Sequence, residues 1–157
     1  MGMTLRSDAF DGGKTIPGRY TPDGADNSPP LTWSEPPDRT KELALIVDDP
    51  DAPRPEPWVH WVLYKIPAEV MRLTEGIRRT PTLTVPPGAL QGKNSWSTIG
   101  YHGPAPPPGH GIHHYHFRLY ALNAPLAVSQ GLDKAGLLEA MRGHVVAEAE
   151  LIGTYER

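Results

Sequence analysis

The sequence contains no cysteine, which excludes disulfide bridges, thiolate metal sites and a cysteine nucleophile. It also lacks a basic block, since 15 Lys and Arg stand against 18 Asp and Glu, a formal net charge of −3. This balance argues against a nucleic acid as partner. No apolar run is long enough for a signal peptide or a membrane span, so we predict a cytoplasmic protein with no membrane span.

Proline and glycine are abundant, with 19 and 16 residues in a chain of 157. They separate apolar runs and form no low-complexity repeat, which favours long, stiff loops on a β-sheet scaffold over a helical bundle. The chain is long enough to bury one hydrophobic core and shows no internal boundary. We therefore predict a single domain over residues 1–157.

Period-two alternation of apolar residues predicts the strands that carry the candidate site. In the strand predicted at 42–49, alternation places Asp49 on the core-facing side. The run 58–66 is apolar on both faces, which is typical of a central strand, and alternation groups His60 with Val62.

A third strand is predicted at 113–122, where alternate residues form a better core face than their neighbours do. That core face consists of His113, Tyr115, Phe117 and Leu119. Asp133 and Gly143 are typical of the cap and the stop of a short helix, and alternation resumes in a last strand from 145 to 155. These elements predict a mainly β fold, an antiparallel β-sandwich with Greek-key connections and a few short peripheral helices.

Six of the seven histidines lie between positions 60 and 116, and this clustering is the first functional signal. Metal ligation is one interpretation, but His113 and His114 are adjacent and so face opposite sides of a strand, and no HExxH-type helix is present. We predict neither a metal nor a cofactor. Four of the six are interpreted as surface and loop histidines: His102, His110, His114 and His116.

The segment 103–111 is rich in proline and glycine and leads directly into a strand. Its prolines alone are compatible with a polyproline ligand for a partner protein. A rigid loop that walls a pocket is the favoured interpretation, because loops on a scaffold commonly carry binding sites.

Two segments resemble the signature regions of the phosphatidylethanolamine-binding protein family: Asp49-Pro50-Asp51-Ala52-Pro53 with Trp58-Val59-His60, and Gly103-Pro104 with Gly111-Ile112-His113-His114-Tyr115. The prokaryotic branch often called Raf kinase inhibitor-like proteins is similar along nearly the whole chain. The resemblance implies a cavity that binds a small anion such as phosphate or the phosphorylethanolamine headgroup. The ligand-binding residues that it implies are Asp49, Pro53, Trp58, His60, Gly103, His113 and Tyr115.

Within that cavity we expect the Asp49 carboxylate to accept an N–H of His60, which fixes the imidazole tautomer and favours protonation. His60 and His113 are then the expected donors to an anion. Family members commonly have Arg at the position of His114. Alternation turns this side chain away from the cavity, so the cavity is expected to survive while an outward salt bridge is lost.

The favoured function is a non-enzymatic binding module. The resemblance also implies a regulatory inhibitor of a kinase or protease, and it implies a homodimer. The alternative is a hydrolase-type enzyme that uses Asp49, His60 and His113 as general acid and base. Against it, no serine lies in a G-x-S-x-G motif. A third hypothesis is an interaction protein whose proline-rich loops bind a partner and whose cavity is incidental.

Overall fold

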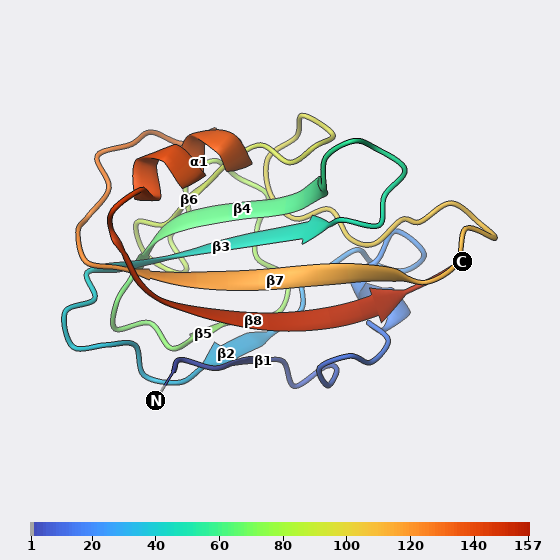
Figure 1. The fold of residues 1–157 in the computed structure, drawn as a ribbon, viewed down its shortest axis with the longest axis horizontal. Helices are drawn as coiled ribbons and strands as arrows, with labels where there is room; N and C mark the ends of the chain where they lie inside the picture. Colours follow the sequence, from blue (N-terminus) through green and yellow to red (C-terminus); the bar gives the residue numbers. More distant parts are fainter. Residues whose placement is uncertain (1) are drawn as a thin grey trace.

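The protein, in a computed structural model that describes residues 2–157, consists of two antiparallel β-sheets (Figure 1). The larger sheet has five strands in the order β6-β4-β3-β7-β8 and the smaller has three in the order β1-β2-β5. The larger sheet contains β3 (Glu42–Asp49), β4 (Trp58–Pro67), β6 (Leu90–Gln91), β7 (His113–Leu122) and β8 (Val145–Tyr155). The smaller contains β1 (Leu5–Arg6), β2 (Leu31–Trp33) and β5 (Arg72–Leu73). The predicted mainly β sandwich is confirmed.

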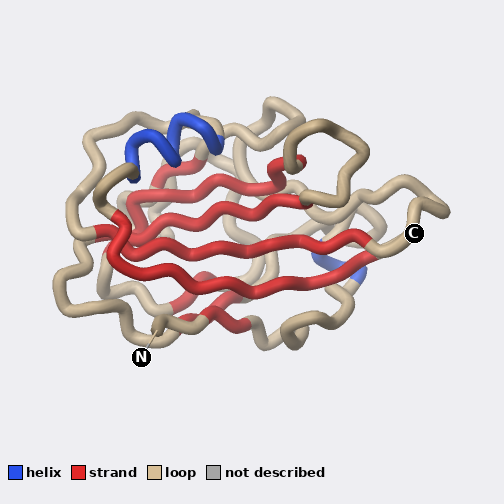
Figure 2. Tube along the Cα trace, viewed as in Figure 1, coloured by secondary structure: helices blue, strands red, loops and turns tan. Residues whose placement is uncertain are grey.

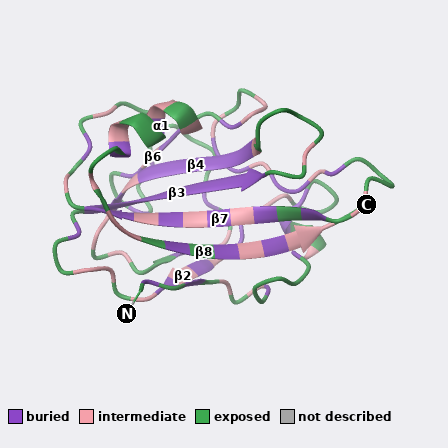
Figure 3. Cartoon of the chain, in the orientation of Figure 1, coloured by how far each residue is buried: buried purple, intermediate pink, exposed green. Residues whose placement is uncertain are grey.

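The main hydrophobic core lies between the two sheets, and Figure 2 shows the smaller sheet behind the larger one. Leu45 of β3 and Leu31 of β2 are both fully buried in it. A second cluster lies on the outer face of the larger sheet, where Ile46 packs with Leu137 of the helix α1 (Lys134–Met141). Because β3 is covered on both faces, every one of its residues is buried, and Figure 3 shows it in one colour.

The predicted short helix is confirmed as α1, the only α-helix among the residues that the structure describes. Asp133 caps its first turn, because Oδ1 accepts the N–H of Gly136 at 2.8 Å. The chain leaves the helix through Gly143, whose φ of +81° suits glycine. A single turn of 3-10 helix, η1 (Gly18–Tyr20), lies near the amino terminus. No helix within residues 2–157 has the length and apolar character needed to cross a bilayer.

The pairing of β3 with β4 contains a β-bulge that sets the direction of one functional side chain. Val47 pairs with Trp61 and Asp48 pairs with Val59, so His60 is the extra residue. An extra residue inverts the alternation of the strand from that point on.

The bulge turns His60 away from the face on which Val62 packs beneath α1. Its imidazole instead lies edge-on to the ring of Tyr115, with ring centroids 5.1 Å apart. Tyr115 belongs to the core between the sheets. The prediction that His60 and Val62 share a face is therefore wrong, because counting by two assumes an unbroken strand ladder.

Candidate functional site

A cavity of about 210 Å³ lies where β3 ends and β4 and β7 begin, at the right-hand end of the larger sheet in Figure 1. Pockets for drug-sized ligands are larger, roughly 300–1,000 Å³, so this cavity suits a small ion or headgroup. Its lining consists of Asp49, Ala52, Pro53, Arg54, Trp58, His60, Trp96, Ala105, Pro106, Pro107, His113 and Tyr115. Because Ala105, Pro106 and Pro107 are part of it, the prediction that the loop 103–111 walls a pocket is confirmed.

Six of the seven residues expected at the site border this cavity, namely Asp49, Pro53, Trp58, His60, His113 and Tyr115. Gly103 lies outside the lining, and its N–H donates to Asp26 Oδ1 at 2.9 Å. A Cβ at this position would lie 2.2 Å from the carbonyl oxygen of Tyr20. Glycine is therefore required here for a close approach of two backbone segments.

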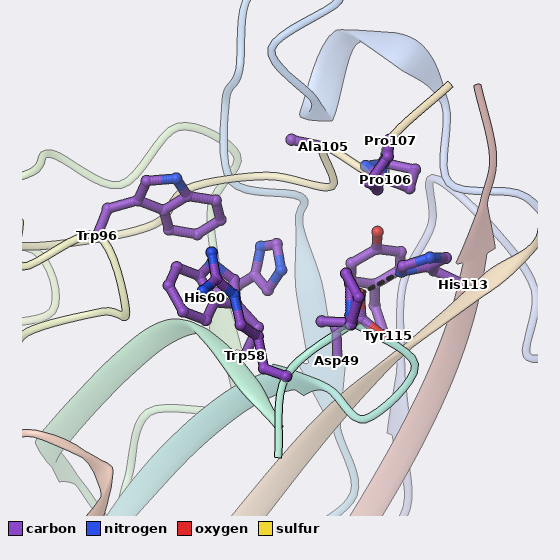
Figure 4. Close-up of a pocket in the computed structure, with 12 residues that line it drawn as sticks. Asp49, Trp58, His60, Trp96, Ala105, Pro106, Pro107, His113 and Tyr115 are labelled. Atoms are coloured by element: carbon purple, nitrogen blue, oxygen red, sulfur yellow. Dashed lines mark hydrogen bonds and ion pairs between the residues drawn. The ribbon is translucent and has the colours of Figure 1, made fainter. Parts of the chain in front are cut away.

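Asp49, at the end of β3, pairs with His113, at the start of β7 (Figure 4). His113 Nδ1–H donates to Asp49 Oδ2 at 2.6 Å, and the backbone N–H of Asp51 donates to Oδ1 at 2.8 Å. Both side chains of the pair are almost fully buried. The expectation that Asp49 accepts from His60 is thus wrong. Both β4 and β7 flank β3, but Asp49 Oδ2 accepts from His113 of β7, while His60 of β4 binds a backbone carbonyl.

His60 is held by a backbone carbonyl instead of a carboxylate. Its Nδ1 lies 2.6 Å from the carbonyl oxygen of His102. A carbonyl can only accept a hydrogen bond, so Nδ1 carries the proton. Burial lowers the pKa of His60 to about 4, and the imidazole is neutral at physiological pH. The expected protonation of His60 is therefore wrong, and so is its role as a donor to an anion, because the other nitrogen is left as an acceptor.

The neutral state of His60 predicts a pH-dependent stability. An unfolded chain holds this imidazole near its ordinary pKa of ~6.5, so it binds the proton before the folded chain does. Lowering the pH from 7 to 5 is expected to remove about 2 kcal/mol of unfolding free energy through this group. Urea titrations of the wild type and of His60→Gln at both pH values measure the difference. Equal pH slopes in the two proteins would contradict the assignment.

Aromatic rings form one wall of the cavity. The indole of Trp96 stacks on the imidazole of His102 with ring centroids 3.4 Å apart, and Trp58 meets Trp96 edge-on at 5.5 Å. The guanidinium of Arg54 lies 5.0 Å from the centre of the Trp58 ring. Trp96 was missed as a lining residue from the sequence, because it lies outside the two segments that resemble the family's signature regions.

His110 was also missed, because we interpreted it as a loop histidine. Its Nδ1 lies 2.6 Å from Nε2 of His113, so a single proton is shared between the two rings. Asp49, His113 and His110 thus form one hydrogen-bonded chain from the end of β3 to the surface. Nothing in the sequence marks this contact, since it depends on the path of the loop 103–111.

The hydroxyl of Tyr115 is buried and has no hydrogen-bond partner within residues 2–157. Figure 4 shows it pointing toward the loop of Pro106 and Pro107. Burial raises the pKa of Tyr115 far above its usual value, so the group stays protonated. A buried polar group without a partner costs about 1–3 kcal/mol, which makes this hydroxyl the least satisfied group at the cavity.

Outside the cavity, His114 Nδ1 lies 2.8 Å from Asp51 Oδ2. The side chain of His114 lies outside the cavity lining, as alternation predicts, and its imidazole reaches an acidic partner. In the described part of the chain, no group of three or more His, Cys, Asp or Glu side chains is placed to hold a metal ion.

Known proteins resemble this chain over its full length. The family described as phosphatidylethanolamine-binding protein matches residues 6–156. A UPF0098 protein of Methanothermobacter thermautotrophicus is 48% identical over 155 residues, which cover 99% of each chain. The crystal structure of a phosphatidylethanolamine-binding protein homologue from Chlamydia trachomatis has a TM-score of 0.89 at 42% identity and covers 99% of this chain and 98% of its own. For E. coli YbcL the TM-score is 0.91 at 33% identity, with 100% and 99% covered.

Proposed function

The chain belongs to the phosphatidylethanolamine-binding protein family, and we propose that it is a non-enzymatic binding module whose cavity holds a small anion, phosphate or the phosphorylethanolamine headgroup. The observation that carries the proposal is the Tyr115 hydroxyl, a buried donor with no partner among residues 2–157, beside a cavity of small volume. An oxygen of an anion would satisfy this donor. Trp58 and Pro53 supply apolar walls that exclude water and strengthen such a hydrogen bond.

His113 and His114 provide a matched pair for testing the proposal, because they are adjacent on β7 and face opposite sides. His113→Ala leaves Asp49 Oδ2 without its donor beside the ligand, so affinity for phosphorylethanolamine is expected to fall at least about tenfold. His114→Ala alters only an exposed contact and is expected to leave the affinity unchanged. Calorimetric titration of both folded variants measures this, and equal effects would place the anion elsewhere.

Hydrolysis is the second candidate function. The hydrogen-bonded series Asp49, His113 and His110 supports it, because a carboxylate that orients an imidazole can help that imidazole act as a general base. Against covalent catalysis, the cavity lining drawn from residues 2–157 contains no Ser, Thr, Cys or Lys. We expect phosphate and carboxyl esters to be hydrolysed no faster than in buffer alone. Hydrolysis that is lost in His113→Ala and retained in His114→Ala would establish the enzyme instead.

A further inference from the structure

The fixed tautomer of His60 leaves one ring nitrogen, Nε2, without a proton. Nδ1–H is committed to the carbonyl of His102, so Nε2 is an unprotonated acceptor. His60 borders the cavity and lies edge-on to Tyr115. The site therefore offers one acceptor, His60 Nε2, and one uncommitted donor, the Tyr115 hydroxyl, on two rings whose centroids lie 5.1 Å apart.

The hydrogen-bonding groups of Asp49 and His113 at the cavity are already engaged, so they add neither a free donor nor a free acceptor. Both oxygens of Asp49 already accept hydrogen bonds, and the carboxylate repels additional negative charge. His113 donates Nδ1–H to Asp49, and its Nε2 is engaged by His110. The titratable and charged groups around His60 and the cavity are Asp48 and Asp49 of β3, Arg54 of the following loop, His102 and His110 of the loop before β7, and His113 and Tyr115 of β7.

We propose that the cavity selects oxyanions that carry a proton, so that a phosphomonoester with one P–OH group binds more tightly than a sulfate ester or phosphodiester of the same charge. The P–OH group donates to His60 Nε2, while an unprotonated oxygen accepts from the Tyr115 hydroxyl. A fully ionised oxyanion would direct its lone pairs at the lone pair of Nε2 and would leave that acceptor unpaired. This inference rests on the proposed anion-binding function and names the ligand class of that same site.

The difference in affinity between protonated and fully ionised oxyanions is expected to be large, because His60 Nε2 accepts a hydrogen bond from the first and is left without a donor by the second. A site built to hydrogen-bond a substrate hydroxyl rejects analogues that lack it far more strongly than an apolar pocket rejects a missing methylene. Since a hydrogen bond that involves a charged partner is worth more than a neutral one, we expect at least about a tenfold difference in affinity.

The test compares three small monoanions on the unmodified protein at pH 5: methyl phosphate, methyl sulfate and dimethyl phosphate. A phosphomonoester loses its second proton near pH ~6, so at pH 5 methyl phosphate is a monoanion with one P–OH group. Methyl sulfate and dimethyl phosphate carry the same charge without a donor. The dimethyl phosphate arm represents the diester of a lipid headgroup, and the methyl phosphate arm represents a free monoester.

Methyl phosphate is expected to bind at least about tenfold more tightly than either of the other two and to weaken when the pH is raised to 8. Equal binding of all three would overturn the proton selectivity while leaving the anion site in place. Tighter binding of methyl sulfate or dimethyl phosphate would overturn it as well. If none of the three binds, both the selectivity and the proposed function are wrong.

Discussion

Asp49→Ala is expected to lower the free energy of unfolding by about 3 kcal/mol, the largest stability loss of any single change at the cavity. The substitution leaves two donors without an acceptor, His113 Nδ1–H and the backbone N–H of Asp51. His113 is fully buried, so water replaces the carboxylate poorly. Urea unfolding followed by circular dichroism measures the loss as a shift of the midpoint at unchanged slope.

Asp51→Ala is the matched control, two residues further along the same turn. Its carboxylate is 40% exposed and pairs with the half-exposed His114. Surface pairs of this kind contribute roughly 0–1 kcal/mol, so the control is expected to remain close to the wild type. If both variants lose the same stability, the buried contact between Asp49 and His113 does not support the site as described.

Tyr115→Phe is expected to move stability and affinity in opposite directions. Without ligand, the variant removes a buried hydroxyl that has no partner within residues 2–157, so the protein should become more stable by about 1 kcal/mol. With phosphate or phosphorylethanolamine, the same change removes the uncommitted donor at the cavity. The affinity should then fall by roughly 10-fold to 100-fold. Thermal unfolding with and without ligand measures both effects in one series.

A structural role for the hydroxyl predicts the opposite pattern. If Tyr115→Phe destabilises the ligand-free protein and leaves the affinity unchanged, the hydroxyl is satisfied inside the protein and is not a ligand group. Phe117→Leu serves as the control, because Phe117 is buried in the same strand but does not border the cavity. It should lower stability through lost packing and leave the affinity unaffected.

Strong apolar periodicity made the strands around the cavity predictable from sequence. The strand predicted at 113–122 coincides with β7, and its inward residues His113 and Tyr115 are buried as expected. Asp49 is likewise buried at the end of β3. In an unbroken strand, alternate side chains point to opposite faces, so the order of apolar and polar residues is enough to predict which side chains are buried.

The hydrogen bonds within the site were not predictable in the same way. His60 faces the cavity because a β-bulge adds one residue to β4, and a bulge leaves no trace in a run that is mainly apolar on both faces. β4, which carries His60, and β7, which carries His113, both lie beside β3, so strand order alone does not decide which histidine reaches Asp49. The contact of His110 with His113 depends on the path of the loop 103–111. The family resemblance, which the comparisons confirm, supplied the set of residues near the cavity but not these partners.

The most direct test of the account follows the histidine ring nitrogens by 15N NMR while methyl phosphate is added at pH 5. Before addition, His60 is expected to show a protonated Nδ1 and a bare Nε2, because Nδ1–H donates to a carbonyl and burial lowers the pKa of His60 to about 4. On binding, the Nε2 signal of His60 should shift toward that of a hydrogen-bonded acceptor, and the signals of the distant His144 should stay unchanged. Saturable binding of methyl phosphate with no change at His60 would contradict the account.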